Sequence, residues 1–426
     1  MPYRTRLVAV GACAIDTILT VPHFPAEDSK LRATSLRKRR GGNTPNTLEV
    51  LQELISDDVD DAATRPDRPQ SNVPASIDLS LMAVLPSRVC AQTEFIASSF
   101  EMDAHAYTKS TNVDLFHCIF RENYTEPISA YIVSSEASSS RTIVNHNPLP
   151  EMTFEEFVVQ AEKLITISAT QDEQHSRRIW FHFEGRVPEI TYKCIQYLRK
   201  HPALQLAKQQ LGSELILRIS VELEKPLRNG LRDLVLGADY VFYSRSWAEG
   251  EGYGSAEACL KGEAEQLGQQ RVESLLTPDK LLICTWGAQG ACSLMSECWI
   301  DSALSRLQDY HVSKSPAYVT HDLDQVVIGT TGKRLICMVA CCFILIHIAL
   351  GAGDAFIAGA LFGLIRREME WHCGLGVQKG GWSVEQTLKF ANGVAGRKIL
   401  QQGFGGLGAA TRQLRNALDL QSATNS

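Results

Sequence analysis

The segment Gly351-Ala352-Gly353-Asp354 carries the strongest structural signal in the chain, and residues 355–366 after it have the pattern of a helix. A turn of such small residues leaves backbone N–H groups open at a helix N-terminus, where they can bind an anion. A carboxylate beside that anion can accept a proton from an attacking hydroxyl group, as phosphoryl transfer requires. The simpler interpretation is a helix N-cap with Asp354 as the capping acceptor.

A second glycine-rich segment, Arg40-Gly41-Gly42-Asn43-Thr44-Pro45-Asn46, lies near the N-terminus and opens another helical pattern. Two glycines allow a close backbone approach, and amides three residues apart lie on one helix face. Each amide offers both donors and an acceptor, which suits a ligand with many hydroxyl groups. A capped helix with a tight turn would explain Asn43 but not the combination of two glycines with Asn46.

These two segments resemble the signatures of the pfkB (ribokinase-like) carbohydrate kinases, and within that family the ketohexokinases, also called fructokinases. The resemblance extends from about residue 7 to residue 407. It includes Val10-Gly11 with Ala14-Ile15-Asp16, Arg141-Thr142-Ile143-Val144, Trp180-Phe181-His182-Phe183-Glu184-Gly185-Arg186, Ser220-Val221-Glu222-Leu223-Glu224-Lys225-Pro226 and Thr285-Trp286-Gly287-Ala288-Gln289-Gly290.

The resemblance implies an α/β fold in which a mainly parallel sheet has helices on both faces and carries a small β lid. It implies one kinase domain over residues 1–420, a lid at about residues 17–40, and a tail at 421–426. In ketohexokinases the lids of two subunits interlock, so the resemblance also implies a homodimer through the lid. Independently, the alternation of strand and helix patterns after residue 151 indicates a parallel sheet, whose ligands bind beyond the carboxyl ends of the strands.

The activity implied by the resemblance is transfer of the γ-phosphate of ATP to a hydroxyl group of a small sugar, most closely a ketohexose such as fructose. Asp354 would be the base, and Gly351, Ala352 and Gly353 would form the anion hole. The implied sugar-binding residues are Asp16, Asp28, Gly42, Asn43 and Asn46. The implied nucleotide-binding residues are Arg141, Glu184, Arg186, Glu222, Arg245, Thr285, Gly287, Gly290 and Asn392. Mg²⁺ would arrive on the nucleotide phosphates rather than in a protein cage.

Most of these positions also have a simpler structural interpretation as strand-end turns, surface charges or buried ion pairs. The basic cluster Arg37-Lys38-Arg39-Arg40 can likewise be a solvated strand end, a nuclear signal or a rim that attracts anions.

Composition narrows the class of protein. The chain is 44% hydrophobic and 21% charged, which is ordinary for a globular domain, and its net charge of −6 argues against nucleic acid as a main partner. Twelve scattered cysteines without a Cys-x-x-Cys pair predict neither a disulfide framework nor a metal site. The N-terminus lacks the pattern of a signal peptide, so we expect a cytoplasmic protein.

Two segments interrupt the family pattern. Residues 57–79 are rich in Asp, Pro, Ser and Asn, which predicts a disordered surface insertion. Residues 328–349 stand where the family has Asp-Thr before the anion turn, and they contain twelve consecutive apolar residues at 335–346. That run is short of the ~20 residues that cross a membrane.

A retained intron or a wrong gene model would explain the second insertion. Three functions therefore stay open: a sugar kinase, a non-catalytic relative that binds sugar or nucleotide and is disabled by the insertion, and a kinase for another small alcohol such as a nucleoside.

Overall fold

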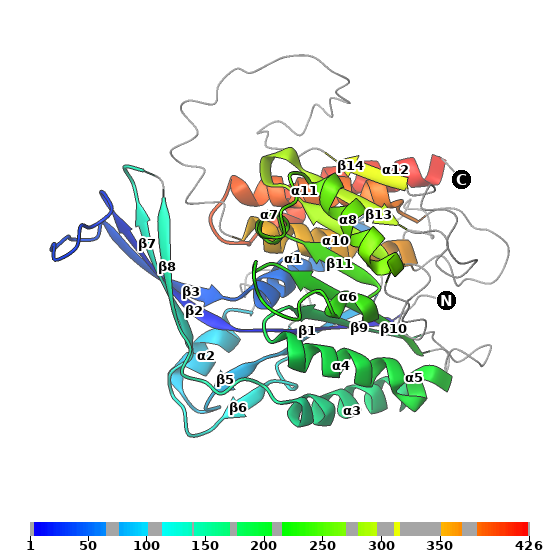
Figure 1. The fold of residues 1–426 in the computed structure, drawn as a ribbon, viewed down its shortest axis with the longest axis horizontal. Helices are drawn as coiled ribbons and strands as arrows, with labels where there is room; N and C mark the ends of the chain where they lie inside the picture. Colours follow the sequence, from blue (N-terminus) through cyan, green and yellow to red (C-terminus); the bar gives the residue numbers. More distant parts are fainter. Residues whose placement is uncertain are drawn as a thin grey trace, which may run out of the picture.

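An eight-stranded sheet forms the centre of the protein, in the order β14-β13-β12-β11-β10-β9-β1-β4 (Figure 1). The computed structural model describes residues 4–64, 76–100, 113–138, 140–170, 177–206, 215–269, 280–295, 311–315, 351–368 and 381–424. The strands are β1 (Arg4–Val10), β4 (Ser76–Met82), β9 (Arg177–Glu184), β10 (Leu215–Leu223), β11 (Tyr240–Tyr243), β12 (Leu281–Thr285), β13 (Ala291–Met295) and β14 (His311–Ser315). From β4 to β12 all neighbours are parallel, and β13 and β14 add antiparallel pairs. The predicted α/β fold with a mainly parallel sheet is confirmed.

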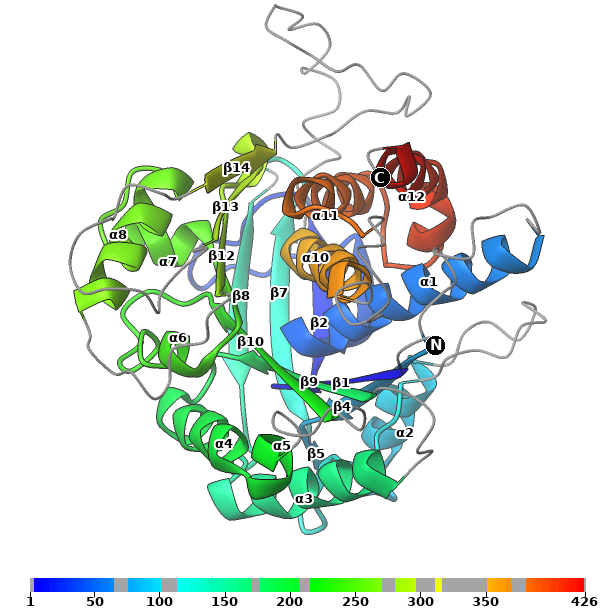
Figure 2. The same ribbon diagram turned by 90° about the vertical axis from the view of Figure 1, so that its right-hand side faces the viewer.

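Helices cover both faces of this sheet (Figure 2). One layer contains α1 (Asn43–Thr64), α10 (Ala352–Glu368), α11 (Val384–Ile399) and α12 (Leu407–Thr424). The other contains α3 (Phe154–Thr170), α4 (Pro188–Lys200), α5 (Pro202–Leu206), α6 (Leu234–Gly237), α7 (Arg245–Gly250) and α8 (Ala256–Gln269). A smaller unit combines α2 (Ala91–Ser98) with the paired strands β5 (Val84–Pro86) and β6 (Ile119–Arg121).

The apolar sequence of β1 shows why the sheet is buried on both sides. Leu7 and Ala9 pack into the core on the α1 and α10 side, while Val8 and Val10 pack into the core on the α3 and α4 side. Side chains of a strand alternate between the faces, so a strand between two helical layers must be apolar almost throughout.

A four-stranded lid projects from this body (Figure 1). Its strands are β2 (Ala14–Val21), β3 (Ser35–Gly41), β7 (Ile128–Ser135) and β8 (Arg141–His146), in the order β3-β2-β7-β8. The lid thus includes the predicted region at 17–40 together with a hairpin from much later in the chain.

The prediction that residues 57–79 form a disordered insertion is wrong at both ends of that range. Helix α1 continues to Thr64, and β4 begins at Ser76, while residues 65–75 lie outside the described residues. The apolar insertion at 328–349 also lies outside the described residues.

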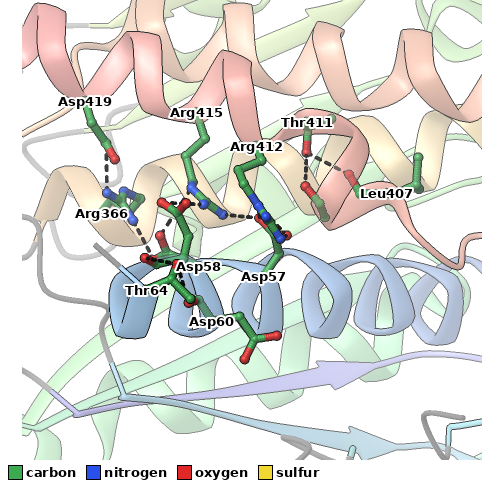
Figure 3. A network of polar contacts seen from close by, with 12 residues as sticks. Asp57, Asp58, Asp60, Thr64, Arg366, Leu407, Thr411, Arg412, Arg415 and Asp419 are labelled. Carbon is green, nitrogen blue, oxygen red and sulfur yellow. Dashed lines mark hydrogen bonds and ion pairs between the residues drawn. The ribbon is translucent and has the colours of Figure 1, made fainter. Parts of the chain in front are cut away.

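The reason for the error is a network of buried ion pairs between α1, α10 and α12 (Figure 3). Arg415 is 2% exposed and lies 2.8 Å from Asp57, 3.3 Å from Asp58 and 3.3 Å from Asp61. Arg366 contacts Asp58 at 2.7 Å. A segment rich in aspartate therefore packs because arginines from distant helices neutralise it.

Among the described residues no helix is both long enough and apolar enough to cross a membrane. Six of the described cysteines are free thiols: Cys13, Cys90, Cys118, Cys194, Cys259 and Cys284.

We predict that Arg415→Met lowers the free energy of unfolding by about 3–5 kcal/mol, because it removes the buried cation that contacts three carboxylates of α1. Urea titration of the variant and the parent protein measures the change. Lys193→Met is the control, since Lys193 makes an exposed ion pair with Glu189 and its loss should change little. An Arg415→Met protein as stable as its parent would contradict a stabilising role for the network.

Candidate active site

The two glycine-rich segments meet in the folded protein. Helix α1 begins at Asn43 and helix α10 begins at Ala352, and both start near the carboxyl ends of the parallel strands. The Asn46 Nδ2 atom donates a hydrogen bond of 2.7 Å to Asp354 Oδ2. Arg40 Nη1 donates to Asn46 Oδ1 at 3.0 Å, so both ends of the amide are held. Residues that are 308 positions apart are thus in direct contact, and their role as a ligand site stays a prediction.

The turn before α10 has the geometry of an anion site. Gly351 has φ +88°, a backbone conformation that favours glycine. A Cβ atom added there would lie 2.6 Å from Phe404 Cζ, whereas one added at Gly353 would meet no atom within 4 Å. The first N–H groups of a helix have no partner within the helix. Near Gly353 they are therefore accessible to a ligand.

Asp354 is the base candidate, and its surroundings favour the protonated form. Burial raises the pKa of Asp354 to about 8; the hydrogen bond from Asn46 opposes this rise, and the charges of Glu222 and Glu224 add to it. A group with a pKa near neutrality can both accept and release a proton during turnover, so Asp354 suits general-base chemistry better than an ordinary aspartate would.

The Gly41-Gly42 pair is required by close packing. Gly42 has φ +103°, and an added Cβ atom would overlap the Ala12 carbonyl oxygen. An added Cβ atom at Gly41 would overlap the carboxylate of Asp16. Asp16 is 6% exposed, and its Oδ2 atom accepts hydrogen bonds from Arg39 Nε at 3.0 Å and Nη2 at 2.9 Å. We did not predict from the sequence that Arg39 binds Asp16. The basic cluster at residues 37–40 was the only feature of the sequence that pointed to such a contact.

Carboxylates gather at the ends of β9 and β10. Glu184 and Glu222 are directly opposite in the sheet register. Asn43 Nδ2 donates to Glu224 Oε2 at 2.8 Å and lies 3.5 Å from Glu222 Oε2. Burial raises the pKa of Glu222 to about 8, with a further rise from Glu224. Burial also raises the pKa of Glu184 to about 7, against the effect of the Ala12 N–H bond at 2.8 Å.

His182 completes this group from within the sheet. It is fully buried, and its Nε2 atom lies 2.8 Å from Glu222 Oε1 while its Nδ1 atom lies 2.8 Å from Ser220 Oγ. Burial lowers the pKa of His182 to about 3, so the ring is neutral. It therefore orients Glu222 without cancelling its charge.

Comparison with known proteins agrees with this geometry. No family model matches the chain. Ketohexokinase from Mus musculus is 24% identical over 402 residues, which cover 94% of this chain and 98% of that protein. The ribokinase structure from Giardia lamblia has a TM-score of 0.59 and 15% identity, covering 98% of this chain and 99% of that one. Arabidopsis thaliana ribokinase, solved with ribose and ATP, has a TM-score of 0.56 and 12% identity, covering 97% of this chain and 99% of that one.

The chain is thus similar in sequence to a ketohexokinase and has the fold of the ribokinases.

The predicted nucleotide loop of this ribokinase-like chain follows β12. Gly287 has φ +57° and Gly290 has φ +89°, and the Trp286 N–H group donates to the Gly290 carbonyl at 2.7 Å to close the turn. Thr285 Oγ1 lies 3.4 Å from the Tyr243 carbonyl oxygen. The Arg245 guanidinium lies 5.6 Å from the Trp286 ring. Because β10, β11 and β12 are parallel, this loop lies on the same sheet edge as the carboxylates.

Other predicted site residues of the chain have different surroundings. Asp28 is exposed between β2 and β3, with φ +58°. Arg186 pairs with Glu151 at 3.0 Å, beside the helical layer of α3 and α4. Asn392 is buried, and its Nδ2 atom donates to the Ser315 carbonyl on β14 at 2.9 Å. Arg141 is exposed at the start of β8, and its pKa is lowered by partial burial and by Arg39. Their ligand-binding roles stay predictions.

The raised pKa of Asp354 predicts a pH-dependent cost to stability. The folded protein holds the proton more tightly than the unfolded chain, so the ionised carboxylate destabilises the fold as pH rises from about 4 to about 8. Asp354→Asn has no such titration. We therefore expect the variant to gain stability relative to its parent across this window, measured by urea unfolding at pH 5 and pH 8.5. If the variant and its parent differed in free energy of unfolding by the same amount at pH 5 and at pH 8.5, this would contradict the raised pKa of Asp354.

Proposed function

We propose that the protein transfers the γ-phosphate of ATP to a hydroxyl group of a small sugar, most closely a ketohexose such as fructose. The hydrogen bond between Asn46 and Asp354 is the observation that carries the proposal. It brings together an amide suited to a polyhydroxyl ligand, a carboxylate suited to proton removal and a turn suited to phosphate. The similarity to ketohexokinase supports the choice of sugar.

The chemistry assigns one task to each part of the site. The sugar hydroxyl gives its proton to the ionised Asp354 carboxylate as its oxygen forms a bond to the γ-phosphorus. The bond between that phosphorus and the bridging oxygen breaks, and the electron pair leaves with ADP. Backbone N–H groups of the Gly351–Gly353 turn would stabilise the charge on the phosphoryl oxygens, an effect that is usually large in enzymes.

Mg²⁺ would arrive with ATP and neutralise part of the phosphate charge. The carboxylates of Glu184 and Glu222 fit this ion as outer partners, because carboxylate oxygens suit a hard cation. Burial raises the pKa of both groups, and neighbouring carboxylates raise it further, so a cation nearby would favour their ionised forms. Within the described residues no group of three or more His, Cys, Asp or Glu side chains is arranged as a metal cage.

The nucleotide would lie along the sheet edge between Arg245 and the loop Thr285 to Gly290. We also propose that the enzyme is cytosolic, since Cys13 and five further described cysteines are free thiols, as is usual in a reducing compartment.

We predict that Asp354→Asn lowers turnover at least about a hundredfold, because the amide cannot accept the proton. Formation of ADP is measured with ATP-Mg²⁺ and a panel of acceptors: fructose, ribose and a nucleoside. The matched control is Asp233→Asn, since Asp233 is exposed and makes no side-chain cap bond at α6. Near-normal turnover of Asp354→Asn would overturn the role of the base. A preference for the nucleoside would replace the sugar assignment, and ATP binding without transfer to any acceptor would favour the non-catalytic relative.

We also propose that two copies pair through their lids. The strand register places Leu36 of β3, Tyr131 of β7 and Val144 of β8 on one face of the lid. These side chains are 61%, 47% and 60% exposed. An apolar face of this kind on a projecting sheet is typical of a protein interface.

Tyr131→Asp is expected to convert a dimer to a monomer, because it places a charge at the centre of this face. Sedimentation of the full chain measures the mass. The control is Val159→Asp on α3, where the valine is 53% exposed on the body of the protein. A parent protein that sediments as a monomer, or a variant that remains dimeric, would contradict the lid interface.

A further inference from the structure

Lys398 is a buried lysine beside the anion turn. It lies in the last turn of α11 and is 1% exposed. A Cβ atom added to Gly351 would lie 3.6 Å from Lys398 Cε, so the end of the lysine side chain packs against the residue that opens the turn. The Nζ atom donates to the Gln401 carbonyl at 3.1 Å and lies 5.3 Å from the centre of the Phe404 ring. The same ring packs against Gly351.

Charges of both signs act on Lys398. Burial lowers the pKa of Lys398 to about 8; the positive charge of Arg39 lowers it further, and the carboxylates of Asp354 and Glu49 oppose that fall. Arg39 is itself bound to Asp16, and Glu49 is bound to Arg40. An ammonium group that is costly to bury thus has a second cation as a neighbour. An anion bound at the Gly351 turn would stabilise this arrangement.

Lys280 shows what a buried lysine looks like when it has only a structural role. It is also 1% exposed, and burial lowers its pKa to about 7. Its Nζ atom donates to the carbonyl of Val235 at 2.6 Å and also to that of Ala238, at the end of α6. Cations at a helix C-terminus are favoured by the backbone dipoles there. Lys280 precedes β12 and so lies at the amino end of the strand, away from the candidate site.

We propose that Lys398 binds the phosphoryl group during its transfer, from the Gly351 side of the turn. This inference rests on the proposed kinase function and adds a side-chain cation to a phosphate site otherwise assigned to backbone N–H groups. Lys398 keeps its proton throughout. Its positive charge would stabilise the phosphoryl oxygens while the bond to ADP breaks, and it would favour ATP, which has a γ-phosphate at the turn, over ADP.

Three variants separate charge from packing. Lys398→Met keeps most of the side-chain length and removes the charge. Lys398→Gln removes the charge but retains a donor for the Gln401 carbonyl. It replaces Lys398→Met as the neutral variant if the Met variant fails to fold. Lys398→Arg keeps the charge. Lys280→Met is the matched control, because it removes a lysine that is equally buried but lies at the other end of the strands.

Calorimetry with a non-hydrolysable ATP analogue and with ADP, each with Mg²⁺, is the deciding measurement. A charge-assisted hydrogen bond of typical strength corresponds to about 10–100-fold in affinity. We expect both neutral variants to lose about that factor for the analogue and much less for ADP. Turnover should fall by at least a similar factor with little change in the KM for the sugar, and Lys398→Arg should restore part of both. Lys280→Met should lower the melting temperature but leave the ratio of the two affinities unchanged.

An unchanged ratio of analogue to ADP affinity in Lys398→Gln would overturn the proposal and leave Lys398 as a helix cap. A parent protein that binds the analogue but phosphorylates no acceptor would overturn the kinase function, while the affinity ratio would still decide the role of Lys398. A parent protein that binds neither nucleotide would overturn both.

Discussion

The contact between α1 and α10 is the constraint on which the site depends. The helices run side by side in the same direction, joined near their N-termini by Asn46 with Asp354 and near their C-termini by Asp58 with Arg366. Their N-termini therefore meet at one place, where the partial positive charge of both helices favours an anion. The ion pairs of Arg415 fix α12 to the same assembly.

This arrangement separates the carboxylates held in ion pairs from the carboxylates of the candidate site. At the C-terminal end of α1 the buried carboxylates have arginine partners at 2.7 to 3.3 Å. At the N-terminal end Asp354 and Glu222 are held by amides, and burial raises the pKa of both. Groups with perturbed pKa values are typical of active sites, where they cost stability. The network of ion pairs far along the same helix can offset such a cost without neutralising Asp354, the proposed base.

The sequence was most informative where structure depends on local pattern. The alternation of strand and helix patterns after residue 151 corresponds to the parallel strands β9 to β12 and their helices, and both glycine-rich segments contain a glycine with positive φ. It misled at residues 57–64, because the arginines that neutralise those aspartates come from α10 and α12, roughly 300 positions or more away. Arg39 and Lys398 escaped notice for the same reason, since their roles come from neighbours that are distant in sequence. The insertion at 328–349 stays a prediction.

The lid is linked to the proposed phosphate site through the backbone at Gly42 and through the charge of Arg39. Strand β3 ends at Gly41 and α1 begins at Asn43, so Gly42, in its positive-φ conformation, connects the lid to the helix whose amides we propose to bind the sugar. Arg39 on the same lid strand binds Asp16, and its charge acts on both Asp354 and Lys398. A sugar that bound Asp16 in place of Arg39 would shift this guanidinium and so change the field at the base and at the buried lysine. Such a shift would couple occupancy of the sugar site to the charge balance that phosphoryl transfer requires, without any movement of the sheet.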